Sequence, residues 1–441
     1  MNNEPNIHIG ILSAPAIHVR LLGNYFCSQT NVMPDSQLLF ESAPDGKVRF
    51  QNGIYDCVEL TPSESRYSFE VSDVTIGVNF HWQRRETQRF SGSMKIINEN
   101  GLVTLINILP VEDYLCSVIS SEMSATANLE FLKAHAIISR SWVLAQINSG
   151  KNADKERCPS STVTDSEIVR WYDREDHLNF DVCADDHCQR YQGITRQTTQ
   201  TVRQAVEATR GIALTDCDGN LADARFSKCC GGVFEEFENC WEPVHHSYLS
   251  ARRDSADAER FPDLTNEENA REWIMSRPVA YCNTSDARVL GQVLNNYDLE
   301  TKDFYRWTVA YSQEELSQLV RDRSGIDFGL IKSLVPLERG TSGRIVRLKI
   351  TGTKRTMIIG KELEIRRTLS ASHLYSSAFV VENGPVDGRG VPSFFRLYGA
   401  GWGHGVGLCQ IGAAVMSVSG HRFDTILHHY FPGAVLTSIY K

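Results

Sequence analysis

The amino-acid sequence predicts an α+β fold, in which a β-rich N-terminal part is followed by a mixed α/β domain with a cleft. Three observations predict it. Residues 7–108 form short segments of alternating apolar and polar side chains, separated by Asn, Gly, Asp and Ser turns. From Pro110 the apolar period becomes that of a helix. Strand and helix patterns then follow one another beyond residue 300.

Composition narrows the class of protein. The chain has 441 residues, of which 41% are hydrophobic, so it can bury a substantial core. Its net charge of −9 provides no basic field for a nucleic-acid partner. No apolar run is long enough for a transmembrane helix, and the first residues lack the basic-then-apolar layout of a secretory signal. Localisation therefore stays open.

The first 104 residues are expected to form the β-rich domain, and residues 105–441 the second domain. The second domain is expected to contain a polar loop at 151–193 and a polar insertion at 250–300. Strands are expected in IHIGIL, AIHVRLL, KVRF, YSFEV, VTIGVNFHW, GSMKII and GLVTLINIL, and later in RIVRLKI and TMIIG. Helices are expected from residue 111, over 128–150 and over 195–210, a hairpin over 211–227, and a strand followed by a helix over 306–323.

Glu122 is the first candidate functional residue. It lies eleven residues beyond Val111, which at 100° per residue places it within about 20° of the centre of the helix's apolar stripe. Burial and the negative end of the helix dipole would both raise its pKa, as a general acid requires. The alternative is a glutamate that turns to water at a fraying helix end. Glu112 and Asp113, in the first turn, are expected to be solvated.

A group of potential metal ligands follows. His177, Cys183, His187 and Cys188 lie within twelve residues, and two thiolates with two imidazoles can complete the tetrahedral shell of zinc. If all four bind, the ion is structural, which we favour; if three bind, a catalytic water can take the fourth place. The alternative is a buried cysteine pair with surface histidines.

A glycine-rich segment near the C-terminus carries Trp402, His404 and Gln410 between and after five alternating glycines. Alternate glycines permit positive φ and close backbone approach, which would leave an indole and an imidazole beside a sugar ligand. A tight core turn with Trp402 buried is the alternative. The strand, turn and long helix of a dinucleotide site are missing.

A cysteine pair, Cys229 and Cys230, precedes two glycines and several acidic residues. Burial is the expected state of the pair, and a second soft-metal site is the alternative. The acidic and aromatic side chains after it either line the cleft or face water; they are Glu235, Glu236, Glu238 and Trp241.

Several of these motifs, taken in order, resemble the stage II sporulation protein D family. LPVEDYLCSVISSEM followed by LEFLKAHAIISRSW is similar to the family signature, and GWGHGVGLCQIGA with HYFPGAVL is similar to its C-terminal motif. The resemblance implies that Glu122 is the catalytic glutamate and that Lys133 and Arg140 are the family's basic residues. It also implies that the His and Cys cluster, just before Tyr191, binds zinc.

The resemblance implies a peptidoglycan lytic transglycosylase that leaves 1,6-anhydro-N-acetylmuramic acid ends, with Glu122 as the single acid/base. Lys133, Arg140, Tyr191, Trp402, His404 and Gln410 are then expected to position the sugars. The rival hypothesis is a non-catalytic glycan-binding enhancer of a cell-wall amidase, and a third is a zinc hydrolase. The expected partners are glycan strands, with or without stem peptides, and the expected site of action is the cell envelope.

Overall fold

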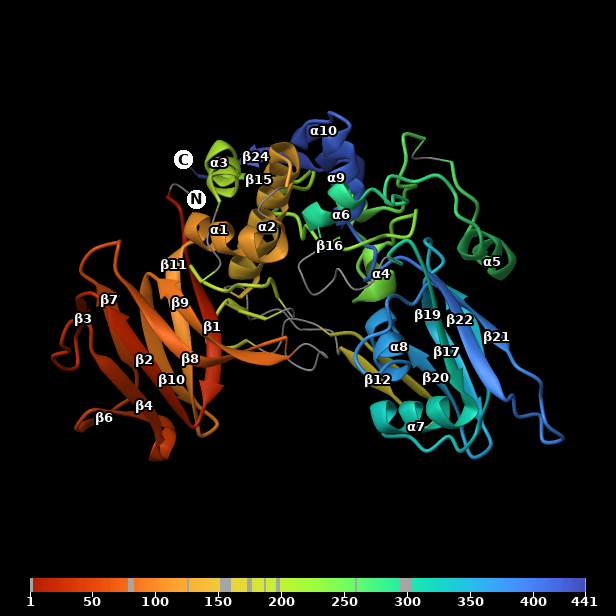
Figure 1. The fold of residues 1–441 in the computed structure, drawn as a ribbon, viewed down its shortest axis with the longest axis horizontal. Helices are drawn as coiled ribbons and strands as arrows, with labels where there is room; N and C mark the ends of the chain where they lie inside the picture. Colours follow the sequence, from red (N-terminus) through yellow and green to blue (C-terminus); the bar gives the residue numbers. More distant parts are fainter. Residues whose placement is uncertain are drawn as a thin grey trace. The chain divides into compact units, whose positions relative to one another are not determined.

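A computed structural model describes residues 3–77, 83–124, 127–150, 160–172, 177–185, 188–195, 199–257, 260–293 and 303–440 (Figure 1). The chain forms two compact units. The first comprises residues 1–153, 175–214 and 436–441, and the second comprises residues 154–174 and 215–435. The mixture of sheets and separate helices confirms the predicted α+β class.

Two six-stranded sheets make up most of the first unit. Strands of this unit show the alternation of buried and exposed residues that the sequence predicts, as in β2, where Ile17, Val19 and Leu21 point inward. One sheet has the order β14 (Val182–Cys183), β1 (Asn6–Ala14), β11 (Leu102–Pro110), β10 (Ser93–Glu99), β7 (Val58–Pro62) and β3 (Tyr25–Cys27). The other has the order β6 (Gly53–Tyr55), β5 (Lys47–Phe50), β4 (Gln37–Ala43), β2 (Ala16–Leu22), β8 (Ser68–Ile76) and β9 (Arg84–Ser91), with a short 3-10 helix, η1 (Pro44–Gly46).

The strand predictions are confirmed where hydrophobic alternation is strong. YSFEV and the start of VTIGVNFHW form one strand, β8, and residues 78–82 lie outside the described part of the chain. Between residues 7 and 108, the strands β3, β4, β6, β7 and β9 were not predicted, because they are short or carry many polar residues.

Three helices complete the first unit. They are α1 (Val111–Glu122), α2 (Leu129–Gly150) and α3 (Gln200–Ala208), and they pack against one another. Apolar residues at helical spacing form the buried face of α1, as predicted. The Thr199 hydroxyl caps α3 by accepting from the Val202 N–H at 3.2 Å.

The predicted domain boundary between residues 104 and 105 is wrong. It falls inside β11, which pairs with β1 on one side and β10 on the other. Because α1 follows β11 directly and packs on it, the strands and the first helices form one unit. The predicted loop at 151–193 is also divided, since residues 154–174 belong to the second unit.

The second unit is built around a five-stranded and a three-stranded sheet. The five-stranded sheet has the order β12 (Ser161–Val163), β13 (Glu167–Arg170), β20 (Thr356–Gly360), β19 (Ile345–Gly352) and β18 (Ile331–Arg339). The other has the order β17 (Arg306–Ser312), β22 (Phe394–Ala400) and β21 (Phe379–Asn383). These strands share a hydrophobic core with α7 (Gln313–Ser324) and α8 (Glu362–Thr368). The predicted β17 and α7 are confirmed, and Ser312 and Glu315 form a capping box between them.

The other elements of the second unit are short. They are β16 (Phe226–Ser227), α4 (Phe237–Cys240), η2 (Ser247–Leu249), α5 (Glu267–Met275), α6 (Ala287–Val293), β23 (Leu408–Cys409), α9 (Gln410–Val418) and α10 (Phe423–Tyr430). The predicted insertion at 250–300 is not a separate insertion in its described part, because α5 buries Ala270, Trp273 and Ile274 and packs against β21 and β22.

The predicted hairpin over 211–227 is replaced by a longer-range pairing. Within it, a single bridge joins Thr215 and Leu221. β15 (Ile212–Thr215) instead pairs with β24 (Val435–Ser438), and the Ile439 N–H donates to the Gly211 carbonyl at 2.8 Å. No helix in the described residues is long and apolar enough to cross a membrane.

Candidate functional site

Glu122 is the last residue of α1, as the sequence predicts. Its side chain is half-buried between the buried residues Ser121 and Met123. The Arg190 backbone N–H donates to Glu122 Oε1 at 3.2 Å. The carboxylate is therefore held by a loop that is distant in the sequence, and it does not simply turn to water at a frayed helix end.

Two tyrosines anchor that loop on either side of Arg190. The Tyr114 hydroxyl, from α1, donates to Gln189 Oε1 at 3.1 Å, and the Tyr191 hydroxyl donates to Asn107 Oδ1, on β11, at 2.6 Å. The two rings stack with centroids 5.3 Å apart. Burial raises the pKa of both hydroxyls, so they remain neutral donors.

Tyr191 was predicted to contact sugar, but the structure gives it another place. Its side chain is buried and its hydroxyl is bonded to Asn107, whose amide in turn donates to the Ser91 and Ser93 carbonyls. Tyr191 is therefore a positioning residue for the loop that holds Glu122.

Three of the four predicted metal ligands come together beside this loop. The ligand atoms of His177, Cys183 and Cys188, hereafter the loop cluster, lie within 4.8 Å of one another, and all three side chains are half-buried. Cys188 Sγ is 3.4 Å from His177 Nε2. That separation is close to the roughly 3.5 Å expected between sulfur and nitrogen around a tetrahedral zinc ion. His187 lies outside the described residues.

The loop cluster is fixed to the edge of a sheet. Cys183 is in β14, which pairs in parallel with β1. A Cβ on Gly10 would lie 2.5 Å from the Phe180 ring, so only glycine lets this ring pack on β1. The same ring lies 4.7 Å from that of His177.

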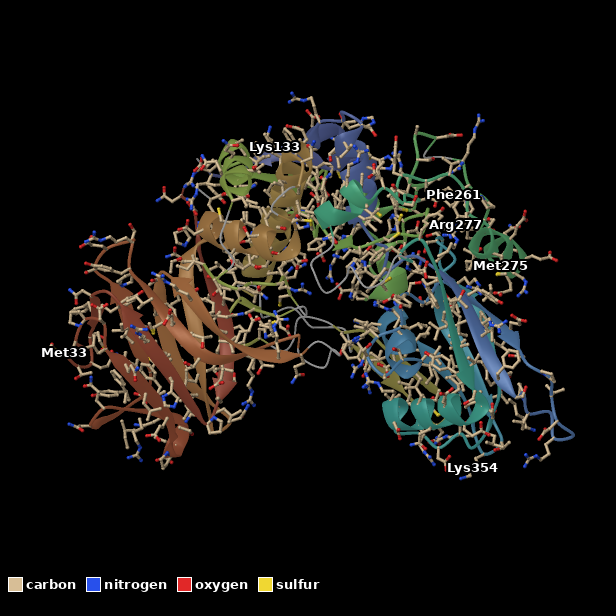
Figure 2. The ribbon with its side chains drawn as sticks, in the orientation of Figure 1. Met33, Lys133, Phe261, Met275, Arg277 and Lys354 are labelled. Atoms are coloured by element: carbon tan, nitrogen blue, oxygen red, sulfur yellow. The ribbon has the colours of Figure 1, made fainter. Side chains whose placement is uncertain are left out.

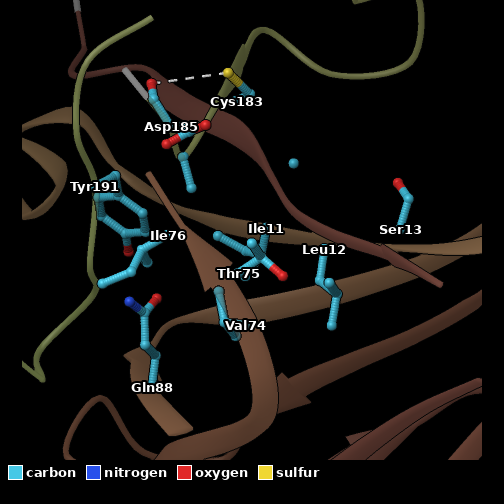
Figure 3. Close-up of a pocket in the computed structure, with 12 residues that line it drawn as sticks. Ile11, Leu12, Ser13, Val74, Thr75, Ile76, Gln88, Cys183, Asp185 and Tyr191 are labelled. Atoms are coloured by element: carbon cyan, nitrogen blue, oxygen red, sulfur yellow. Dashed lines mark hydrogen bonds between the residues drawn. The ribbon is translucent and has the colours of Figure 1, made fainter. Parts of the chain in front are cut away.

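A pocket of about 310 Å³ opens next to the loop cluster (Figure 3). Residues of β1 and β8 form two of its sides, and Cys183, Asp185 and Tyr191 line a third. Gln88 points into it from β9 (Figure 3). The pocket therefore presents apolar side chains and the Gln88 amide next to the loop cluster.

The predicted basic residues on α2 differ in exposure. Lys133 is half-buried, and its Nζ pairs with Glu130 at 2.7 Å (Figure 2). Arg140 is fully buried and forms two hydrogen bonds with Glu112, at 2.8 and 2.7 Å. The remaining guanidinium nitrogen, Nη1, donates to the Ile212 carbonyl. The structure therefore places Arg140 in the core as the partner of Glu112, and a role in sugar binding stays a prediction.

Glu112 was predicted to be solvated, and this is also wrong. It is 7% exposed, and besides Arg140 it accepts hydrogen bonds from the Tyr440 hydroxyl at 2.5 Å and the Gly211 N–H at 3.3 Å. Burial alone would raise its pKa, but the hydrogen bonds and charge of Arg140, together with these donors, lower it below the usual value. Asp113 is exposed, as predicted.

The glycine-rich segment belongs to the second unit and has the predicted backbone. Gly401, Gly403, Gly405 and Gly407 all have positive φ, between 71° and 91°. The segment wraps around the buried Arg344, whose guanidinium donates to the Gly403 and Cys230 carbonyls. A Cβ on Gly405 would lie 2.4 Å from that guanidinium. Sequence reasoning missed Arg344 because nothing in the local pattern links residue 344 to this segment.

The three residues of this segment that were predicted to contact sugar differ in how far they are buried. Trp402 is half-buried and stacks on Phe304, with centroids 4.8 Å apart. Gln410 is buried in the first turn of α9, and its role in positioning a sugar stays a prediction. His404 Nδ1 accepts from the Val406 N–H at 3.0 Å. Burial, and then the nearby arginines 225, 344 and 366, lower the pKa of His404 well below its usual value.

His404 and Trp241 form an aromatic group with Arg225. The rings of Trp241 and His404 are 4.8 Å apart, and the Arg225 guanidinium lies 4.1 Å from the centroid of the Trp241 ring. Asp223 holds this guanidinium through two hydrogen bonds, at 2.9 and 3.0 Å. Half-buried aromatic and guanidinium surface of this kind suits a sugar or another polar ligand.

The acidic residues near Trp241 are not equivalent. Glu235 is fully buried and accepts hydrogen bonds from Asn239, Thr341 and Ser342. It is therefore a structural residue and does not line a cleft. Glu238 pairs instead with the exposed His245 at 2.8 Å.

Cys229 and Cys230 are both buried, as predicted. Cys230 also belongs to a second group of potential metal ligands, hereafter the core cluster, formed by Cys230, Asp254, Cys282 and Cys409. Their ligand atoms lie within 4.8 Å of one another. The sequence offered a soft-metal site at Cys229 and Cys230 as the alternative, but spacing gave no sign that Asp254, Cys282 and Cys409 would join Cys230.

Comparisons with known proteins agree with the predicted resemblance. Residues 99–215 match the family described as stage II sporulation protein, and residues 235–407 match a domain of unknown function. The first match contains Glu122 and the loop cluster.

Three relatives span most of the chain. An uncharacterised protein of Brachyspira hyodysenteriae is 26% identical over 376 residues, which cover 84% of this chain and 80% of the relative. The amidase enhancer of Bacillus subtilis is 24% identical over 331 residues, 74% of this chain but 40% of the relative. Stage II sporulation protein D of Bacillus subtilis is 23% identical over 330 residues, 75% of each chain. Residues 99–215 are therefore similar to the stage II sporulation protein family, and the chain as a whole is similar to proteins named after it.

Proposed function

We propose that this protein is a lytic transglycosylase that cleaves the bond between N-acetylmuramic acid and N-acetylglucosamine in peptidoglycan strands, with Glu122 as its acid/base. The observation that carries the proposal is the half-buried Glu122 carboxylate at the end of α1, held by the Arg190 N–H at 3.2 Å. A carboxyl group in such a setting can exchange a proton with a bound substrate. The family match over residues 99–215 supports the assignment.

One carboxylate suffices for this reaction. The protonated Glu122 donates its proton to the glycosidic oxygen as the bond from that oxygen to the anomeric carbon of muramic acid breaks. The 6-hydroxyl of the same sugar then attacks the anomeric carbon, and Glu122 takes the hydroxyl proton. The products are a free 4-hydroxyl on N-acetylglucosamine and a 1,6-anhydro end. Because the attacking hydroxyl is in the same sugar, a high effective concentration replaces an activated water.

Zinc would stabilise the loop that holds Glu122. His177, Cys183 and Cys188 have the spacing for it, and His187 is the proposed fourth ligand. Arg190 lies two residues after Cys188. An ion that holds the loop cluster in place would therefore also hold the Arg190 backbone N–H that donates to Glu122. A closed shell of four ligands supplies stability to the loop and takes no part in the chemistry.

The test is mass spectrometry of peptidoglycan, with and without stem peptides, after incubation with the protein. Wild type is expected to release anhydro-muramyl products, and Glu122→Gln should lower their rate by about 10²- to 10⁴-fold because general acid–base catalysis is lost. Asp113→Asn, an exposed change on the same helix, is the matched control and should keep full activity. An active Glu122→Gln variant would exclude Glu122 as the acid/base.

A second candidate function is a glycan-binding enhancer of a cell-wall amidase. The relative named amidase enhancer and the group of Arg225, Trp241 and His404 favour it. In this function, neither wild type nor Glu122→Gln releases anhydro products, and both accelerate an added amidase. Either function places the protein's action in the cell envelope.

A further inference from the structure

We propose that the core cluster, formed by Cys230, Asp254, Cys282 and Cys409, binds a zinc ion that holds the second unit together. This site is separate from the loop cluster, which belongs to the first unit. It does not depend on the proposed enzymatic function.

The distances in the core cluster match the edges of a zinc tetrahedron. Cys230 Sγ is 3.6 Å from Cys282 Sγ and 3.5 Å from Asp254 Oδ2. Zinc–sulfur bonds of about 2.3 Å and a zinc–oxygen bond of about 2.1 Å give edges of roughly 3.8 Å and 3.6 Å. A disulfide would require the two sulfurs to lie at about 2.05 Å. The side chains are therefore arranged around a common centre and are not cross-linked in pairs.

The buried Asp254 carboxylate is a second reason to expect a cation in the core cluster. Asp254 is 0% exposed. Among the described residues no lysine or arginine forms an ion pair with it, and its one basic neighbour is His429 Nε2 at 3.6 Å. A buried carboxylate without a cationic partner is costly, and a divalent ion bound by Asp254 and thiolates removes that cost.

The surroundings hold the ligands in place. Asp254 accepts from the Tyr430 hydroxyl and from the Cys282 N–H, each at 2.9 Å. The Cys230 N–H points at Cys409 Sγ at 3.3 Å, and the Gly232 N–H points at Cys230 Sγ at 3.4 Å. Hydrogen bonds of this kind orient metal ligands and favour the thiolate form.

Helix α9 contributes in two ways. Cys409 is its N-cap residue, where the positive end of the helix dipole favours a thiolate. In the first turn of α9, a Cβ on Gly412 would lie 2.3 Å from the Tyr430 hydroxyl and 2.7 and 2.8 Å from the Asp254 oxygens, so this glycine lets the helix pack directly on the cluster. Four buried ligands leave no position open for a reacting water, which makes the site structural.

A zinc ion here would join segments that are far apart in the sequence. Cys230 follows β16, Asp254 follows η2, Cys282 lies between α5 and α6, and Cys409 ends β23. Cys230 alone is 52 residues from Cys282 and 179 from Cys409. The ion would therefore link these short elements, which few strand pairings connect.

The test measures zinc bound to the full chain by inductively coupled plasma mass spectrometry after dialysis against metal-free buffer. The Cys183→Ser Cys188→Ser double variant serves as the background, because it removes the loop cluster. This background is expected to retain one zinc ion per chain. Adding Cys230→Ser, Cys282→Ser or Asp254→Ala should remove it. Adding Cys240→Ser, a buried cysteine outside the core cluster, should not.

Cobalt substitution keeps the proposal testable if a ligand variant fails to fold. In the background protein, Co²⁺ should give thiolate-to-cobalt charge-transfer absorption and the intense visible bands of a tetrahedral site. Folded background protein that binds neither zinc nor cobalt would overturn the proposal, as would a disulfide between core-cluster cysteines in peptide mapping. Loss of zinc with Cys229→Ser but not with Asp254→Ala would overturn the assigned ligand set. None of these measurements depends on glycan cleavage.

Discussion

The loop cluster and the core cluster are made of similar side chains but differ in accessibility and in origin along the chain. His177, Cys183 and Cys188 are half-buried, lie within twelve consecutive residues and adjoin the segment that holds Glu122. The core cluster is fully buried and collects its ligands from four distant segments. A half-buried cluster on one loop can orient a reactive group, whereas a buried cluster between distant segments serves the fold.

The same difference separates the residues predicted to bind sugar. In the first unit, Arg140 and Tyr191 are buried and bonded to protein groups, while Lys133 is half-buried. In the second unit, Gln410 is buried, while Trp402 and His404 are half-buried. We therefore expect substitutions of the buried residues to change stability, and substitutions of the half-buried ones to change ligand binding.

The largest expected effect on stability is that of Arg140→Met. It leaves the Glu112 carboxylate buried without its cation, which should lower the free energy of unfolding by about 3–5 kcal/mol. Urea unfolding followed by circular dichroism measures it. The double variant Glu112→Leu Arg140→Met should recover most of the loss because no charge is left unpaired. If the variant instead has a raised KM for glycan and unchanged stability, Arg140 contacts the sugar.

Gly405→Ala should have a smaller effect. The added Cβ meets the Arg344 guanidinium at 2.4 Å, and alanine is strained at a φ of +78°. We expect a loss of about 1–3 kcal/mol in thermal or urea unfolding. Gly388→Ala is the control, because a Cβ there has no neighbour within 4 Å. Equal stability of the two variants would show that close packing around Arg344 does not hold the segment.

Tyr191→Phe tests the distinction between positioning and sugar binding. It removes the hydroxyl that donates to Asn107 Oδ1 and leaves a buried oxygen without that donor, at a cost of about 1–3 kcal/mol. The rate of glycan cleavage should fall with little change in KM, because the loop that holds Glu122 loosens. Tyr67→Phe, on the surface, should change neither quantity by much. A large rise in KM without a loss of stability would indicate direct contact with sugar.

The smallest effect is a pH dependence from His404. Burial lowers its pKa in the folded protein well below the unfolded value of 6.5, so folding keeps this imidazole neutral. The stability contribution is complete above about pH 6.5 and is lost as the pH falls below it, by at most about 1.4 kcal/mol per pH unit. Melting temperatures of wild type and His404→Asn between neutral and mildly acidic pH measure it. The variant should show the shallower decline, and parallel curves would contradict a neutral His404 in the folded protein.

The sequence identified the features that depend on neighbouring residues. Helical spacing placed Glu122 at the end of α1, spacing within twelve residues suggested the loop cluster, and alternate glycines indicated the positive-φ segment. Features that depend on distant residues were not predictable in this way. Tyr440, which hydrogen-bonds to Glu112, is too distant in the sequence for a local pattern to predict the contact. The same holds for the residues that cluster with Cys230. The domain boundary failed for the same reason, since the β1–β11 pairing crosses it.

The hydrogen bond between Tyr440 and Glu112 joins residues 328 positions apart. During synthesis at about 5–20 residues per second, α1 emerges from the ribosome roughly 15–65 s before Tyr440 does. Until then the first unit lacks β24 and the Tyr440 hydroxyl that donates to Glu112. The intervening 215–435 segment has that time to fold. The last step in forming the unit that carries Glu122 is therefore set by translation.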